Sequence, residues 1–268
     1  MKLQSGVAEF GQLRDGIHRA VRPDGVRIFV KVRHDMPADF FLAEARGLAV
    51  LSSAPLRVPD VISVWEHGIA LEDLGRGRAS ARDWENAGRG LADLHCSAGE
   101  RFGLDSRGWC GDSTQDNTPD EDGFHFFAER RLLAQGRRAF DRGLLEHYDM
   151  RQLETICARL CEMLPKQPPV RVHGDLWMGN VHACANGELA LIDGGAVHYG
   201  WAEVDLAMLT LFGEPPASFF CAYETAAKID KTWRKRAALL NLYHLLNHLN
   251  LFGASYLGGV RTVLRRYS

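Results

Sequence analysis

The sequence predicts an α+β protein of two lobes, a small β-rich N-terminal lobe over residues 1–74 and a larger, mainly helical C-terminal lobe over residues 75–268. Three observations predict this division. Short β-type runs separated by turns fill the first seventy residues, helical periodicity dominates from Arg82 onward, and the segment LGRGRAS between them has the composition of a linker. Because 46% of its residues are hydrophobic, the chain can form a hydrophobic core of substantial size.

The N-terminal lobe begins with a predicted β-hairpin. HRAV and RIFVKV are separated by a turn at Asp24-Gly25, a dipeptide typical of tight hairpin turns. Residues 37–51 then place apolar side chains close to helical spacing, and RVPDVISVW and IALEDL return to strand character. We therefore expect a small sheet with one helix packed on it.

The C-terminal lobe is predicted to be helical around one β-rich island at residues 169–193. The expected helices cover residues 82–97, 121–138, 144–164, 201–212, 215–227 and 231–252. A glycine-rich loop at residues 99–123 is long enough to suggest a function of its own, although a plain surface loop is an equal alternative.

Composition narrows the classes of function. A formal net charge of −2 gives no electrostatic reason to expect nucleic acid or an anionic membrane as a partner. No run approaches the ~18 apolar residues of a membrane span, and the N-terminus lacks the pattern of a secretory signal, so we expect a cytoplasmic protein. The six cysteines form no CxxC pair and are expected to be reduced thiols without a metal.

The stretch RVHGDLWMGNVHACANGELALID carries the strongest functional signal. Phosphoryl transfer needs a carboxylate to accept the proton of the attacking hydroxyl, and an amide oxygen with a second carboxylate to hold Mg²⁺ against the phosphates. Asp175, Asn180 and Asp193 offer these groups in this order. The Asn186-Gly187 turn predicts a hairpin with Asn180 and Asp193 at its open ends, where both side chains could meet one ion.

The N-terminal lobe offers matching candidates for binding a nucleotide. Lys31 lies within the strand FVKV, and Glu44 in the following helix could pair with its ammonium and direct it toward the phosphates. Main-chain groups of Glu72 and Leu74 could bind the edge of an adenine that Leu71 covers. The alternative for these last positions is a connector that touches no ligand.

With these motifs in place, the chain resembles the fructosamine kinase (ketosamine-3-kinase) family, within the kinase-like fold shared with aminoglycoside phosphotransferases and choline kinases. The resemblance extends through FVKV, FLAEARGL, GLADLH, GERFGLD, HGDLWMGN, YGWAEVDLAMLTLFG and NLYHLLNHLNLFG. It implies ATP- and Mg²⁺-dependent phosphorylation of the 3-hydroxyl of a small-molecule ketoamine or glycated amine, a repair reaction.

The resemblance also implies roles for individual residues. Asp175 would be the catalytic carboxylate, Asn180 and Asp193 would bind magnesium, and Lys31 with Glu44 would hold the phosphates. The candidates for substrate contacts are Gln115, Asn117, Trp177 and His248.

Two other features of these motifs are expected to be structural. Asp205, in EVDLAM, is expected to brace the catalytic loop by accepting backbone hydrogen bonds. His244 and His248 lie four residues apart on one predicted helix, but no third ligand has suitable spacing, and we expect packed histidines there rather than a metal pair.

Three segments depart from the family pattern. The phosphate loop reads Arg14, Asp15, Gly16, so an acidic side chain is expected beside the phosphates unless Arg14 or Lys31 compensates for it. Two glycines follow Asp193 where the family has a rigid proline turn, which should loosen that loop. The tryptophan that usually follows the segment Gln115-Asp116-Asn117 is missing, with TPDEDGFHFF in its place, so substrate recognition is expected to differ.

Two alternatives remain open at this stage. One is a phosphotransferase for an aminoglycoside, a choline-like compound or another hydroxylated small molecule. The other is a nucleotide-binding pseudoenzyme, an alternative that the altered phosphate loop at residues 14–16 favours. Retention of Lys31, Asp175, Asn180 and Asp193 together favours an active enzyme, because a binding module has no need of a proton acceptor.

Overall fold

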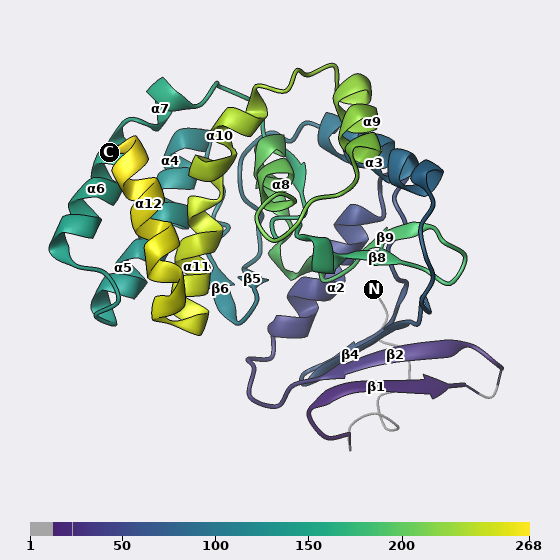
Figure 1. The fold of residues 1–268 in the computed structure, drawn as a ribbon. Coiled ribbons are helices and arrows are strands. Elements are labelled where there is room, and N and C mark those ends of the chain that lie inside the picture. Colours follow the sequence, from purple (N-terminus) through teal and green to yellow (C-terminus); the bar gives the residue numbers. More distant parts are fainter. Residues whose placement is uncertain (1–12, 23) are drawn as a thin grey trace.

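The computed structural model describes residues 13–22 and 24–268. Its N-terminal lobe is built on a four-stranded antiparallel sheet in the order β1-β2-β4-β3 (Figure 1). The strands are β1 (Gly16–Val21), β2 (Arg27–Val32), β3 (Val61–Trp65) and β4 (Gly68–Glu72). The predicted hairpin is therefore present, and β4 pairs with both β2 and β3.

The sequence around the first turn explains why the hairpin forms there. Gly25 adopts a positive φ of 84°, and Oδ1 of Asp24 accepts a hydrogen bond from the Val26 amide at 3.1 Å. Strand β2 alternates between buried and less buried residues, with Ile28, Val30 and Val32 in a small core. Lys31 therefore lies on the opposite face of β2 from these three residues.

Helix α2 (Phe40–Leu51) joins the sheet to the rest of the molecule. Its buried residues Phe41, Leu48 and Leu51 belong to the main hydrophobic core together with Ile69 and Leu71 of β4. The apolar spacing in residues 37–51 thus predicted a real helix, and its Glu44 is buried as well.

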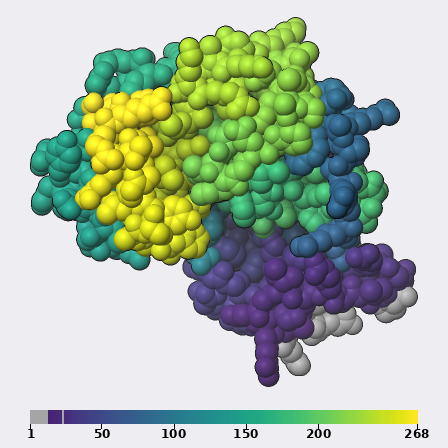
Figure 2. All heavy atoms as spheres, viewed as in Figure 1, coloured from purple at the N-terminus to yellow at the C-terminus, as the bar shows by residue number. Residues whose placement is uncertain are grey.

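The C-terminal lobe is mainly helical, as predicted, and Figure 2 shows it as a larger mass above the N-terminal lobe. Its helices are α3 (Ala81–Cys96), α4 (Gly123–Phe127), α5 (Ala134–Asp141), α6 (His147–Ala158), α7 (Leu160–Met163), α8 (Ala202–Met208), α9 (Ala217–Ala227), α10 (Trp233–Leu240), α11 (Leu242–Phe252) and α12 (Leu257–Tyr267), with a π-helical turn η1 (Ala128–Leu133) and short 3₁₀ turns η2 (Met178–Asn180), η3 (Gly194–Ala196) and η4 (Ala254–Tyr256).

Three two-stranded sheets complete the fold. They pair β5 (Gly108–Cys110) with β6 (Ser113–Gln115), β7 (Val170–Val172) with β10 (His198–Gly200), and β8 (Val181–Ala183) with β9 (Leu189–Leu191). The first of these lies inside the glycine-rich loop 99–123, which therefore contains regular structure. No helix among residues 13–22 and 24–268 combines the length and apolar character needed to cross a lipid bilayer.

Several boundaries differ from the predictions. The helix predicted over residues 121–138 is interrupted by η1, and the one predicted over 231–252 divides at Asn241, whose Nδ2 donates to the Ala207 carbonyl at 2.8 Å. Helix α12 was not predicted, because its apolar face is narrow. Only Val260, Val263 and Leu264 of that helix are buried among the described residues.

Candidate active site

The segment between β7 and β9 places three candidate side chains around one cleft. Gly174, with φ of 79°, turns the chain after β7 and leads into Asp175. Asn180 precedes β8 and Asp193 follows β9, and the Ile192 amide donates to the Asn180 carbonyl at 3.1 Å. Asp175, Asn180 and Asp193 all line a cleft of about 270 Å³. The hairpin therefore has its two polar ends on the same side as Asp175.

Asp205 holds the loop that carries Asp175, as predicted. Its carboxylate is fully buried and accepts the His173 amide at 2.7 Å and the Gly174 amide at 2.9 Å. Burial acts to raise the pKa of Asp205, but the hydrogen bond and charge of His95 and the amide donors outweigh it and hold the pKa below the ordinary value. A buried carboxylate with several donors stays ionised and fixes the backbone in front of it.

His173 gives the same loop a second support. Its Nε2 lies 2.8 Å from the Ile192 carbonyl, so Nδ1 is left to accept the Asp175 amide at 3.3 Å. The ring thus ties the loop that carries Asp175 to the end of β9. Burial raises the pKa of the Asp175 carboxyl, and His173 opposes this shift in part. A carboxylate with a raised pKa is a stronger proton acceptor than an exposed aspartate.

Lys31 lies between two carboxylates at the junction of the lobes. Its Nζ donates to Oε1 of Glu44 at 2.8 Å and also contacts Oδ1 of Asp193. The predicted Lys31–Glu44 pair is therefore present in the structure. Glu44 is nearly inaccessible whereas the side chain of Asp193 is 44% exposed, so Glu44 fixes the ammonium and Asp193 can turn toward a ligand in the cleft.

The oxygen atoms around Asn180 suit a hard divalent cation. Nδ2 of Asn180 donates to the Asp175 carbonyl at 2.8 Å, which directs the amide oxygen the other way. Asn180 and Asp193 line the same cleft, and amide and carboxylate oxygens are the ligands that Mg²⁺ takes in phosphate-binding sites. The residues present therefore fit a magnesium ion.

The cleft also contains residues that we did not single out from the sequence. They come from α2 and from the β5–β6 hairpin, and they are Phe40, Trp109, Gly111 and Asp112. Trp177 lines the cleft too, and its ring packs edge-on against Phe212. The length of the 99–123 loop was the one signal that pointed to this region.

Gln115 and Asn117, expected to contact the substrate, are only 2% and 1% exposed and do not line this cleft. Gln115 donates to the Asn117 side chain and to the Ala196 carbonyl, and it accepts the Tyr243 hydroxyl at 3.0 Å. Arg131 donates to Oδ1 of Asn117 at 2.7 Å. This buried network fixes the segment after Asp193, so we expect these two residues to position the site rather than to touch substrate.

His248 also lies outside the lining of the cleft, as do Glu72 and Leu74 in the hinge between the two lobes. His248 packs against Phe212, which in turn contacts Trp177, so these rings connect it to the cleft. In the hinge, the Glu72 amide donates to Asp60 and the Leu74 carbonyl accepts from Ala185.

The segments that depart from the family pattern have their own packing. Asp15 accepts a hydrogen bond from the His34 amide at 3.0 Å and contacts the His34 ring, so the partner of this carboxylate is His34, a residue we had not considered beside Arg14 and Lys31. Gly194 packs on the backbone of α2, where a Cβ would lie 2.7 Å from the Leu48 amide nitrogen. We expected the two glycines to loosen this loop, but the structure uses them for close approach.

Comparisons with known proteins agree with this geometry. A sequence model described as fructosamine kinase matches residues 10–268. The chain belongs to the fructosamine kinase family. A Synechocystis protein assigned as a ketoamine kinase is 35% identical over 251 residues, which are 90% of this chain and 82% of the relative.

Solved structures give the same result. The crystal structure of a Thermobifida fusca protein assigned as a fructosamine-3-kinase has a TM-score of 0.85 at 34% identity and covers 97% of this chain and 99% of its own. The streptomycin–ATP ternary complex of APH(2")-IIa has a TM-score of 0.62 at 14% identity, covers 99% and 97% of the two chains, and shows a shared fold. The predicted kinase-like fold and the predicted family are confirmed, and the chain is an ATP-dependent phosphotransferase of that family.

Proposed function

We propose that this fructosamine kinase family member transfers the γ-phosphoryl group of ATP to the 3-hydroxyl of a small ketoamine. The observation that carries the proposal is that Asp175, Asn180 and Asp193 line one cleft and that Lys31 contacts Asp193. Similarity to a ketoamine kinase and to a fructosamine-3-kinase supports the choice of acceptor and of hydroxyl. We also propose that the boundary between the two lobes lies after residue 74.

The reaction follows from these positions. The acceptor hydroxyl oxygen forms a bond to the γ-phosphorus, the bond from that phosphorus to the bridging oxygen of ADP breaks, and Asp175 takes the hydroxyl proton. Asp205 and His173 hold Asp175 in place through its loop. Asn180 and Asp193 would hold Mg²⁺, whose charge neutralises the phosphates when it is bound.

The nucleotide would extend from this cleft toward the hinge. Lys31, fixed by Glu44, would contact the phosphates, and an adenine would meet main-chain groups of Glu72 and Leu74. Because the Glu72 amide donates to Asp60 and the Leu74 carbonyl accepts from Ala185, an adenine would use the Glu72 carbonyl and the Leu74 amide.

The acceptor end of the cleft suits a small sugar derivative. Phe40, Trp109 and Trp177 supply apolar walls, and Asp112, whose two carboxylate oxygens each accept from Arg33 at 3.2 Å, supplies a polar group on the same cleft. A cleft of about 270 Å³ is at the small end of ligand sites. We therefore expect ribulosyl and fructosyl amines to be better substrates than bulky glycated proteins.

The test incubates the protein with ATP, Mg²⁺ and one of four acceptors: fructosyl-lysine, ribulosyl-lysine, choline or an aminoglycoside. Mass spectrometry of the acceptor should show a one-phosphate increment for the two ketoamines, and the Asp175→Asn variant should form far less of this product in the same time. Phosphorylation of the aminoglycoside or choline alone would establish the alternative acceptor class. ATP binding without any phosphorylation would establish a pseudoenzyme.

A further inference from the structure

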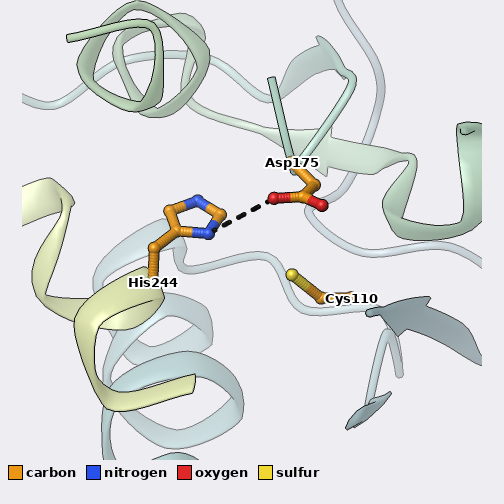
Figure 3. A group of neighbouring side chains, drawn as sticks. All are labelled: Cys110, Asp175 and His244. Atoms are coloured by element: carbon orange, nitrogen blue, oxygen red, sulfur yellow. Dashed lines mark ion pairs between the residues drawn. The ribbon is translucent and has the colours of Figure 1, made fainter. Parts of the chain in front are cut away.

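Asp175 also belongs to a second group of side chains that could hold a metal ion, and the other two members of this group have no part in the proposed reaction. Cys110 at the end of β5, Asp175 and His244 on α11 point toward one another (Figure 3). Their sulfur, oxygen and nitrogen atoms all lie within 4.8 Å of one another, and Nδ1 of His244 is 3.8 Å from Oδ1 of Asp175. These residues come from three separate parts of the chain, so neither CxxC spacing nor paired histidines could reveal the cluster.

The histidine in this cluster has a free nitrogen. His244 is 3% exposed, and its Nδ1 has no hydrogen-bond partner within residues 13–22 and 24–268. A buried polar atom left unpaired is destabilising, and a metal ion bound at this position would supply the missing partner. Burial lowers the pKa of His244 and keeps the ring neutral, and its Nδ1 lies 3.8 Å from Oδ1 of Asp175. Burial also raises the pKa of the Cys110 thiol, so a metal must displace that proton to bind the sulfur.

The three donor types select a particular class of metal. Thiolate sulfur and imidazole nitrogen with one carboxylate oxygen are ligands of zinc, whereas magnesium prefers oxygen alone. In a tetrahedral zinc site the ligand atoms are about 3.3–3.8 Å apart, a spacing that follows from zinc–ligand bonds of about 2.0–2.3 Å. Small side-chain movements would bring the three atoms to that spacing, and the side chain of Asp175, 20% exposed, faces the cleft by which an ion could enter.

We propose that Cys110, Asp175 and His244 bind a zinc ion that inhibits the enzyme. Binding releases the thiol proton of Cys110 to solvent and forms zinc bonds to its sulfur, to Nδ1 of His244 and to a carboxylate oxygen of Asp175. The fourth position of the zinc faces the cleft and takes a water molecule. While zinc holds Asp175, this carboxylate cannot accept the proton of the acceptor hydroxyl. The inhibition rests on the proposed role of Asp175, whereas the binding itself does not.

Binding is tested first by cobalt, which replaces zinc and reports a thiolate ligand through sulfur-to-cobalt charge-transfer absorption. The untagged protein titrated with Co²⁺ alone should develop this band, and Cys110→Ala should not. Cys161→Ala, which removes an exposed thiol of α7, is the matched control and should keep the band. Bound cobalt without the band in the parent protein, or a band that survives in Cys110→Ala, would overturn the site.

Inhibition is then measured with Zn²⁺ at saturating MgATP and ketoamine. The zinc concentration for half inhibition should rise at least about tenfold in Cys110→Ala and remain unchanged in Cys161→Ala. Equal inhibition of parent and Cys110→Ala would place the zinc effect at the nucleotide metal and overturn the inhibitory role. If Cys110→Ala does not fold, His244→Phe replaces it in both measurements, because this change removes the nitrogen and keeps the ring shape.

An absence of kinase activity in the parent protein would contradict the proposed function but would leave the cobalt titration fully informative. The kinase assay and the cobalt titration therefore test the proposed function and the proposed metal site independently.

Discussion

Lys31 Nζ lies 2.8 Å from Oε1 of Glu44 and contacts Asp193 at the same time. This relationship couples the sheet of the N-terminal lobe to the helix behind it and to the proposed magnesium ligand. The two carboxylates differ in exposure, since Glu44 is buried and Asp193 is half-exposed. Glu44 therefore keeps the ammonium in place when Asp193 turns toward an ion.

We predict that Glu44→Gln weakens the use of ATP. The neutral amide holds the ammonium less strongly, so Lys31 stays with Asp193 and draws it away from the metal position. We expect kcat/KM for ATP to fall at least about tenfold, with the larger part in KM. Arg46→Gln, on an exposed position of the same helix, is the control and should leave both constants unchanged. Parental kinetics in Glu44→Gln would remove the pair from the nucleotide site.

Asp175→Asn should lower kcat by about two to four orders of magnitude, the usual loss when a positioned general base is removed. Asparagine keeps the shape of the side chain but does not accept the hydroxyl proton. Calorimetry with MgATP should give a Kd close to the parental value, because Asp175 serves the acceptor and not the nucleotide. A variant that turns over at the parental rate would disprove the assignment of the base.

Magnesium should be required for tight ATP binding, because Asn180 and Asp193 offer their oxygens to an ion and not directly to phosphate. Calorimetric titration of ATP with Mg²⁺ and with a chelator measures this directly. Equal affinity in the two titrations would remove the metal assignment. The Asp193→Asn variant should reduce the difference between them, since it loses the charged ligand.

Gly194→Ala should destabilise the protein and reduce turnover together. A Cβ at this position would lie 2.7 Å from the Leu48 nitrogen and 2.9 Å from the Gly47 carbonyl carbon, so the loop after Asp193 must move away from α2. We expect a loss of about 1–3 kcal/mol in the free energy of unfolding, measured with urea, as for other overpacked positions. Gly258→Ala in α12 meets open space and should be neutral or slightly stabilising.

The pair between Asp149 and Arg261 should make stability depend on pH. Arg261 donates to both carboxylate oxygens of Asp149, at 2.9 and 2.8 Å, and joins α12 to α6. Burial acts to raise the pKa of Asp149, but the hydrogen bonds from Arg261 and the Glu146 amide hold it below 3.8. A carboxyl with a lowered pKa in the folded state stabilises the protein above its unfolded pKa and loses this effect as the pH falls through the folded value.

Asp149→Asn should therefore cost about 2 kcal/mol of unfolding free energy near pH 7, and the difference from the parent should shrink below about pH 4. Urea unfolding of both proteins across this range measures it. Glu154→Gln, exposed on the same helix, is the control and should show little effect. A difference between Asp149→Asn and the parent that does not change with pH would show that the charge is not the stabilising feature.

Much of the fold could be predicted because it depends on local patterns. The Asp24-Gly25 turn, the helical spacing in α2 and the Asn186-Gly187 turn each act over a few residues, and each is present in the structure. The sequence also ordered the candidates Asp175, Asn180 and Asp193 correctly around a hairpin. Here one short segment carries all three residues, so their spacing largely determines where they meet.

Only the tertiary structure could decide contacts between distant segments. Four features depend on how separate elements pack. They are the placement of Trp109 and Asp112 in the cleft, the burial of Gln115 and Asn117, the contact of Asp15 with His34, and the approach of Cys110 to His244. Such contacts leave no periodic trace in the sequence, because each is fixed by the summed packing of a core and not by neighbours along the chain. By itself the sequence thus determined the elements and the chemical groups of the segment 171–193. Packing decided which other side chains reach them.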